Sequence, residues 1–185
     1  MLTTKRTLSL AAASLLVLGL VAGCASDATK EETEYTGEDL GDDRGSRGLD
    51  DSRLNERGLR GVEDDEKSMF LDPNNPLSTR IIYFDFDSDV VKSEFMTALK
   101  AHASYASQKG KTIRLEGHAD ERGTREYNVG LSERRAQAVQ RVLSLEGMSN
   151  DALPTLAFGE ERPADLGHDE SAWAQNRRVE LIYVQ

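Results

Sequence analysis

The chain has 185 residues, a formal net charge of −10 and one cysteine. A single cysteine cannot form an internal disulfide, and an acidic chain without a basic face is unsuited to nucleic-acid binding. The charge is unevenly distributed: residues 26–67 carry 15 acidic and 7 basic residues, whereas residues 78–185 carry 17 and 14. The acidity therefore belongs mainly to the middle of the chain.

Residues 1–23 have the pattern of a secretory signal peptide. Lys5 and Arg6 form a positive start, an apolar run covers residues 8–20, and small residues precede Cys24. The alternative is a membrane-spanning helix, which needs about 20 predominantly apolar residues. This run is shorter, so we expect export and cleavage.

Cys24 is an unpaired cysteine in an exported chain, which calls for an explanation. The run Val21-Ala22-Gly23-Cys24 resembles the lipobox of bacterial lipoproteins. That resemblance implies lipid on Cys24. Because the next residue is Ala25 and not aspartate, it also implies a place in the outer membrane, facing the periplasm. Several acyl chains together anchor a protein stably.

Residues 24–77 are expected to form the lipidated N-terminus and a disordered acidic linker. This stretch has few large apolar residues and many charges, so it cannot bury enough surface to offset its ordering entropy. It is either a spacer of defined reach or a generic linker. The turn-forming run Asp72-Pro73-Asn74-Asn75-Pro76 marks the expected boundary of a single folded domain, residues 78–185.

Within that domain, residue patterns predict an α+β fold with one mixed sheet and helices on one face. Strands are expected at 80–86, 112–116, 155–159 and 179–184. Helices are expected from Val91 to Gly110, from Asn128 to Glu146, and around Trp173. His102 falls on the apolar stripe of the first helix, so we interpret it as a core residue.

Three polar clusters, residues 83–89, 116–123 and 128–136, lie at the predicted ends of strands and the start of a helix. Loops held at strand ends by a rigid sheet are common ligand sites. Because the second strand leads directly into the second long helix, Asp120 should lie near that helix's first turns. Asp120 and Arg135 could then present opposite charges to one ligand.

The same clusters also suggest other chemistries. His118 with Asp120 and Glu121 suggests a metal, but a structural zinc site needs four ligands and His168 has no evident partner in sequence. A serine hydrolase needs an activated nucleophile, and the chain has no Gly-x-Ser-x-Gly motif. The charges could also be solvated loops. We therefore predict no enzymatic activity, no metal and no cofactor.

The motifs carry a specific resemblance. Tyr83–Asp87, Glu116–Thr124, Glu126–Ala136 and Asn176–Val179 together look like the OmpA-like peptidoglycan-binding domain, in the expected order over residues 80–185. The run Leu166–Glu170 and the lipobox are similar to lipoproteins of the Tol-Pal system. These proteins support envelope integrity and cell division, and they also bind the periplasmic protein TolB.

That resemblance implies a binding role in which diaminopimelate of the peptidoglycan stem peptide is the ligand. Asp120 would pair with the ligand's ammonium group and Arg135 with its carboxylate. Arg178 would support Asp120. The other implied site residues would line the pocket or its rim: Phe84, Asp85, Phe86, Asn128 and Leu131. Apart from the resemblance, arginine suits two-point carboxylate recognition, and an ionised aspartate accepts hydrogen bonds only.

Overall fold

The computed structural model describes residues 56–184. These contain a four-stranded sheet of order β1-β4-β2-β3. β4 pairs antiparallel with β1 and β2, and β2 pairs parallel with β3. The strands are β1 (Ile81–Tyr83), β2 (Thr112–His118), β3 (Thr155–Gly159) and β4 (Arg178–Val184). The predicted α+β fold with one mixed sheet is confirmed.

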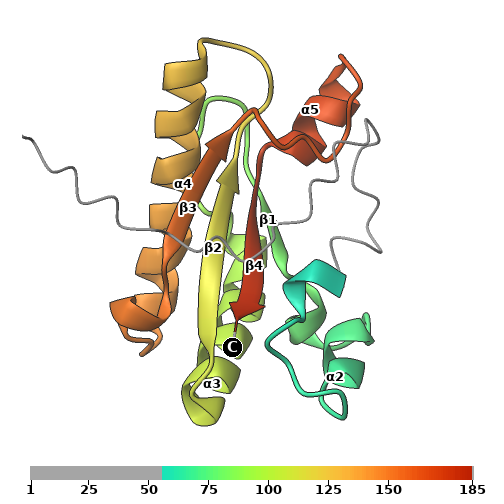
Figure 1. Cartoon of the computed structure of the whole chain (residues 1–185), viewed down its shortest axis with the longest axis vertical. Helices are drawn as coiled ribbons and strands as arrows, with labels where there is room; N and C mark the ends of the chain where they lie inside the picture. The colour runs from blue at the N-terminus through green and yellow to red at the C-terminus, as the bar shows by residue number, and fades with distance from the viewer. Residues whose placement is uncertain (1–55, 185) are drawn as a thin grey trace, which may run out of the picture. The chain divides into compact units, whose positions relative to one another are not determined.

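Two long helices, α3 (Met96–Lys109) and α4 (Arg125–Leu145), pack on one face of the sheet (Figure 1). The shorter helices are α2 (Lys67–Leu71) and α5 (Glu170–Asn176), and 3₁₀ turns cover Pro76–Ser78, Ser93–Phe95 and Asn150–Ala152. No helix within residues 56–184 is long and apolar enough to cross a membrane.

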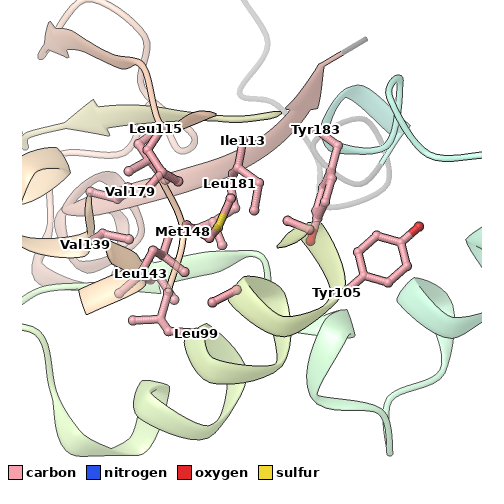
Figure 2. Close-up of a cluster of buried hydrophobic side chains, with 14 of the residues drawn as sticks. Leu99, Tyr105, Ile113, Leu115, Val139, Leu143, Met148, Val179, Leu181 and Tyr183 are labelled. Carbon is pink, nitrogen blue, oxygen red and sulfur yellow. The ribbon is translucent and has the colours of Figure 1, made fainter. Parts of the chain in front are cut away.

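The core lies between the sheet and the two long helices (Figure 2). Val179, Leu181 and Tyr183 alternate along β4 and all three are fully buried against the helices. Successive side chains on a strand point to opposite faces. Arg178 and Glu180 therefore lie on the sheet's other face.

The junction between β2 and α4 is fixed by a helix cap and a close contact. The Thr124 hydroxyl accepts a hydrogen bond from the backbone N–H of Tyr127, so α4 begins at Arg125, three residues earlier than expected. Gly117 lets α4 approach β2, because a Cβ there would lie 2.1 Å from the carbonyl oxygen of Ser132. These two features hold the loop of residues 119–124 beside the first turns of α4.

His102 is a core residue, as predicted. It is fully buried, and its ring nitrogens lie 2.8 Å from the Tyr183 hydroxyl and 3.1 Å from the Thr79 carbonyl oxygen. Burial lowers the pKa of His102 to about 4, so the ring is neutral at pH 7.

The segment of residues 56–77 is folded onto the domain, which corrects part of the expected linker. Leu59, Val62, Phe70 and Leu77 are at most 7% exposed and belong to the core. The expectation that the whole of residues 24–77 is disordered is therefore wrong for this part. The predicted signal peptide (1–23), the lipidation residue Cys24 and the remaining linker to residue 55 lie outside the described residues.

Backbone and charge contacts attach the same segment to β4. The N–H of Gly61 donates to the Tyr183 carbonyl, and a Cβ on Gly61 would lie 2.7 Å from the Val184 backbone. Arg57 forms ion pairs with Glu116 of β2 and Glu180 of β4. Residues 56–62 accordingly lie against the end of β4 on the side away from α4 (Figure 1).

Candidate functional site

A cavity of about 190 Å³ opens where β2 ends and α4 begins. It is smaller than pockets that bury drug-sized ligands, about 300–1,000 Å³, and fits one amino-acid headgroup better. Five predicted site residues line it: Phe86, Asp120, Asn128, Leu131 and Arg135. The remaining lining residues are Asp87, Ala119, Arg122, Gly123 and Tyr127.

Asp120 is the buried acid of the cavity. One oxygen, Oδ1, accepts from the backbone N–H and the Nε of Arg122 at 3.1 and 3.2 Å. The other, Oδ2, accepts from Nη2 of Arg122 at 2.7 Å and from Nη1 of Arg177 at 3.2 Å. Burial by itself raises the pKa of Asp120, but the hydrogen bonds from these arginines outweigh it and hold the pKa below the ordinary value. The carboxylate is ionised at neutral pH.

Arg135 is the buried cation of the same cavity and has no exposed surface. Its guanidinium donates to three backbone carbonyls, those of Ser88 (2.8 Å), His118 (3.0 Å) and Asp85 (3.1 Å). A guanidinium has five N–H donors, and these bonds use three of them. Burial lowers the pKa of Arg135 to about 10, which still leaves it charged at pH 7.

Phe84, Asp85 and Phe86 have three different positions. Phe86 lines the cavity and is largely exposed, whereas Phe84 is buried with its ring centre 5.3 Å from the Arg135 guanidinium carbon. The Asp85 side chain points outward and pairs with Lys92 at 2.7 Å. Asp85 therefore reaches the site only through its backbone carbonyl, which holds Arg135.

The rim of the cavity is formed by the first turns of α4. Asn128 is buried and donates its side-chain amide to Glu160, while Leu131 supplies an apolar wall. Tyr127 donates its hydroxyl to Asp87, which has a φ of 52°. Such a conformation is uncommon for a residue other than glycine and is found often at functional sites.

The predicted role of Arg178 is wrong, because this residue lies on the other face of the sheet. It is fully buried there, and its Nε donates to Glu180 at 2.8 Å. The arginine that contacts Asp120 is its neighbour Arg177, at the junction of α5 and β4. A shift of one residue at the start of a strand moves a side chain to the opposite face.

Comparison with known proteins adds to this geometry. The model of the OmpA family matches residues 83–177, more than half of the chain, and that span includes all the residues of the cavity. The chain belongs to the OmpA family.

Relatives within the OmpA family agree with the resemblance seen in the sequence. The chain is 57% identical over 99 residues to the peptidoglycan-associated lipoprotein of Pseudomonas aeruginosa, covering 54% of this chain and 59% of that protein. It is 41% identical over 124 residues to the Legionella pneumophila peptidoglycan-associated lipoprotein, covering 66% and 68%. The chain thus spans about three fifths of the length of the first of these relatives.

Solved structures agree with this OmpA fold. The peptidoglycan-associated lipoprotein of Burkholderia pseudomallei is 46% identical with a TM-score of 0.60, covering 63% of this chain and 99% of that one. The C-terminal domain of Helicobacter pylori MotB is 21% identical with a TM-score of 0.53, covering 57% of this chain and 84% of that one. At that lower identity the likeness concerns the fold alone.

The face of the sheet opposite α3 and α4 carries a separate charged cluster. Glu116, His118 and Glu180 are buried with potential ligand atoms within 4.8 Å of one another. Both carboxylates are already paired with arginines: Glu116 with Arg57 and Arg114, and Glu180 with Arg57 and Arg178. Three guanidinium groups would repel a cation at this position, so the arrangement is suited to an internal ion-pair network.

Sequence reasoning also missed Arg122 and Trp173 as contributors to the site. Arg122 lies in the predicted cluster 116–123, so its loop was predicted to be part of the site. The hydrogen bonds from its side chain back to Asp120 were not predicted. Trp173 and Phe86 hold the Arg122 guanidinium between them, at 4.2 and 4.1 Å from their ring centres. His168, expected to have no partner, contacts Glu121 at 2.8 Å. These contacts join segments that are far apart in the sequence, so no local pattern reveals them.

Proposed function

We propose that the chain is an outer-membrane lipoprotein that holds peptidoglycan non-covalently, with lipid on Cys24 at one end and the cavity at the other. The single observation that supports it most strongly is a buried carboxylate and a buried guanidinium lining one small cavity at the β2–α4 junction. Relatives up to 57% identical are named peptidoglycan-associated lipoproteins, which agrees with such a ligand.

In this proposal the ligand group is the zwitterionic end of diaminopimelate. Its ammonium donates to Asp120, and its carboxylate accepts from the two N–H donors that Arg135 has left. Leu131 and Phe86 contact the aliphatic stem. In this proposal the protein supplies binding and no bond-making step.

The cavity mouth also suits a protein partner. Phe86 and Tyr127 line the cavity and are exposed although they are large and aromatic, and aromatic side chains are enriched at interfaces. We infer that TolB of the Tol-Pal system binds over this face. In a titration of the lipid-free chain, TolB affinity should fall when stem peptide is present. Unchanged affinity at saturating peptide would place the TolB surface elsewhere.

Pull-down on isolated peptidoglycan tests the proposed function. Asp120→Ala should lose most binding, because removing one partner of a buried charged pair typically costs about 2–5 kcal/mol. Asp151→Ala is a suitable control of equal charge change, since Asp151 is exposed in the 3₁₀ turn Asn150–Ala152 and does not line the cavity. Full binding by a folded Asp120→Ala protein would contradict the assignment.

A further inference from the structure

The carboxylate of Asp120 is saturated in the ligand-free protein. A carboxylate offers roughly four acceptor sites on its two oxygens. Four N–H donors occupy them: the backbone N–H, Nε and Nη2 of Arg122, and Nη1 of Arg177. An incoming ammonium group therefore finds no free acceptor unless one of these donors leaves.

The donors differ in how firmly they are held. Arg177 is 7% exposed and is fixed by further bonds to the Phe84 carbonyl at 3.1 Å and to Glu170 at 2.7 Å. The backbone N–H belongs to the loop itself. The Arg122 side chain supplies two of the four bonds and is 30% exposed. It is the donor that a ligand can displace.

Other contacts give Arg122 a place to remain when it releases Asp120. Its guanidinium lies between the rings of Phe86 and Trp173, 4.1 and 4.2 Å from the ring centres, and Nη1 is 3.4 Å from a Glu170 oxygen. A guanidinium over the face of an aromatic ring is attracted by the ring's negative face. The guanidinium can therefore stay between these two rings after its hydrogen bonds to Asp120 are broken.

We propose that Arg122 is an internal competitor for the ligand's ammonium group: it occupies Asp120 in the empty site and is displaced on binding. This rests on the proposed function, because it regulates the same cavity. Arg122 thereby sets the affinity and favours ligands that also offer a carboxylate to Arg135. A simple amine gains only the Asp120 contact, which Arg122 already supplies.

Calorimetry with a diaminopimelate-containing stem peptide tests the competition on the lipid-free chain. Arg122→Ala should bind about tenfold more tightly than wild type, since about 1.4 kcal/mol of competing hydrogen bonding is removed. Arg125→Ala is the matched control: this arginine is 70% exposed, pairs with Glu161 and does not line the cavity, so its affinity should equal that of wild type.

Trp173 is the only tryptophan of the chain, so its fluorescence reports on the contact between its ring and the Arg122 guanidinium. Peptide should change the emission of wild type and of Arg125→Ala, and the change should be largely lost in Arg122→Ala. In the absence of peptide, carboxyl NMR titration should give a higher Asp120 pKa in Arg122→Ala than in wild type, because two donors to the carboxylate are gone.

The outcomes separate the two proposals. Weaker peptide binding by Arg122→Ala would make Arg122 a direct ligand contact and overturn the competition. Equal affinities, or equal Asp120 pKa values in the two proteins, would overturn the competition alone. Absence of binding in wild type and Arg122→Ala alike would overturn the proposed function and the competition with it.

Discussion

His102 and His118 are both buried, in different surroundings. His102 bonds with Tyr183 and Thr79 in the core, whereas His118 stacks on Phe158 on the face of the sheet opposite α3 and α4. Burial lowers the pKa of His102 to about 4. Burial and then the charge of Arg178 lower the pKa of His118 well below its ordinary value. Both side chains are therefore neutral in the folded protein under conditions that protonate an exposed histidine.

This neutrality predicts acid sensitivity. Between about pH 6.5 and pH 4 the unfolded chain binds protons that the folded chain does not, so stability falls as the pH falls. From pH 7 to pH 5 we expect a loss of about 2 kcal/mol from His102, and a further loss of the same sign from His118. Urea unfolding of residues 56–185 at both pH values measures it. Equal stabilities at pH 7 and pH 5 would mean that these rings are protonated while folded.

Single residues also show where sequence reasoning reached its limit. Asp120 and Arg135 could be placed in one cavity from the sequence because a strand leading into a helix fixes their neighbourhood. Arg177 and Arg178 could not be told apart, because which of them faces the site depends on where β4 begins. Arg122 was missed because its position depends on Phe86, in the loop after β1, and on Trp173 of α5.

At the scale of elements, the segment of residues 56–77 departs most from expectation. Its apolar residues are few and widely spaced, which resembles a linker in composition. They are buried because α3 and β4 offer them a surface: the Phe70 ring packs edge-on against Tyr105 and Tyr183, each at 5.1 Å between ring centres. Composition describes a segment by itself and carries no information about an apolar surface that another element provides.

A pair of neighbouring residues on α2 tests this docking. Phe70 is 1% exposed and Leu71 is 60% exposed. Phe70→Ala should lower the free energy of unfolding by about 3–5 kcal/mol, since a buried aromatic ring is lost, whereas surface changes such as Leu71→Ala usually stay within about 0.5 kcal/mol. Urea denaturation gives both values. If both variants are as stable as wild type, the segment is not part of the folded unit.

The four strands and two long helices were predictable because their periodic patterns are local. The cap at Thr124 extends α4 by one turn beyond the apolar pattern, and β1 keeps only Ile81–Tyr83 because residues 84–92 turn away to build the cavity. The type of each element could be predicted from the sequence. The boundaries that shape the site are set by tertiary contacts, so they could not be predicted.

At the scale of the whole molecule, the docked segment shortens the proposed tether. If residues 25–55 connect Cys24 to the domain as a flexible chain, their 31 residues have a typical span of about 30 Å and a maximum reach of about 105 Å. The domain must find peptidoglycan within that distance of the membrane. We therefore expect the anchor and the cavity to act together, each holding one surface of the envelope.

The anchor can be tested separately from the cavity. Cys24→Ala should remain uncleaved or become soluble, because it removes the only residue that the lipobox resemblance marks for lipid. Palmitate labelling followed by membrane fractionation provides the measurement, with the cavity variant Asp120→Ala as a normally labelled control. Normal incorporation of palmitate by Cys24→Ala would refute the lipoprotein assignment.

The central claim is that the cavity recognises the zwitterionic end of diaminopimelate. Arg135 also holds three backbone carbonyls, so its replacement risks a change in the loops, and a comparison of ligands on the unaltered protein is cleaner. Diaminopimelate differs from lysine by one side-chain carboxylate. In calorimetry, a lysine-type stem peptide should bind about 100-fold more weakly than its diaminopimelate counterpart, corresponding to about 3 kcal/mol. Equal affinity for the two peptides would contradict the account.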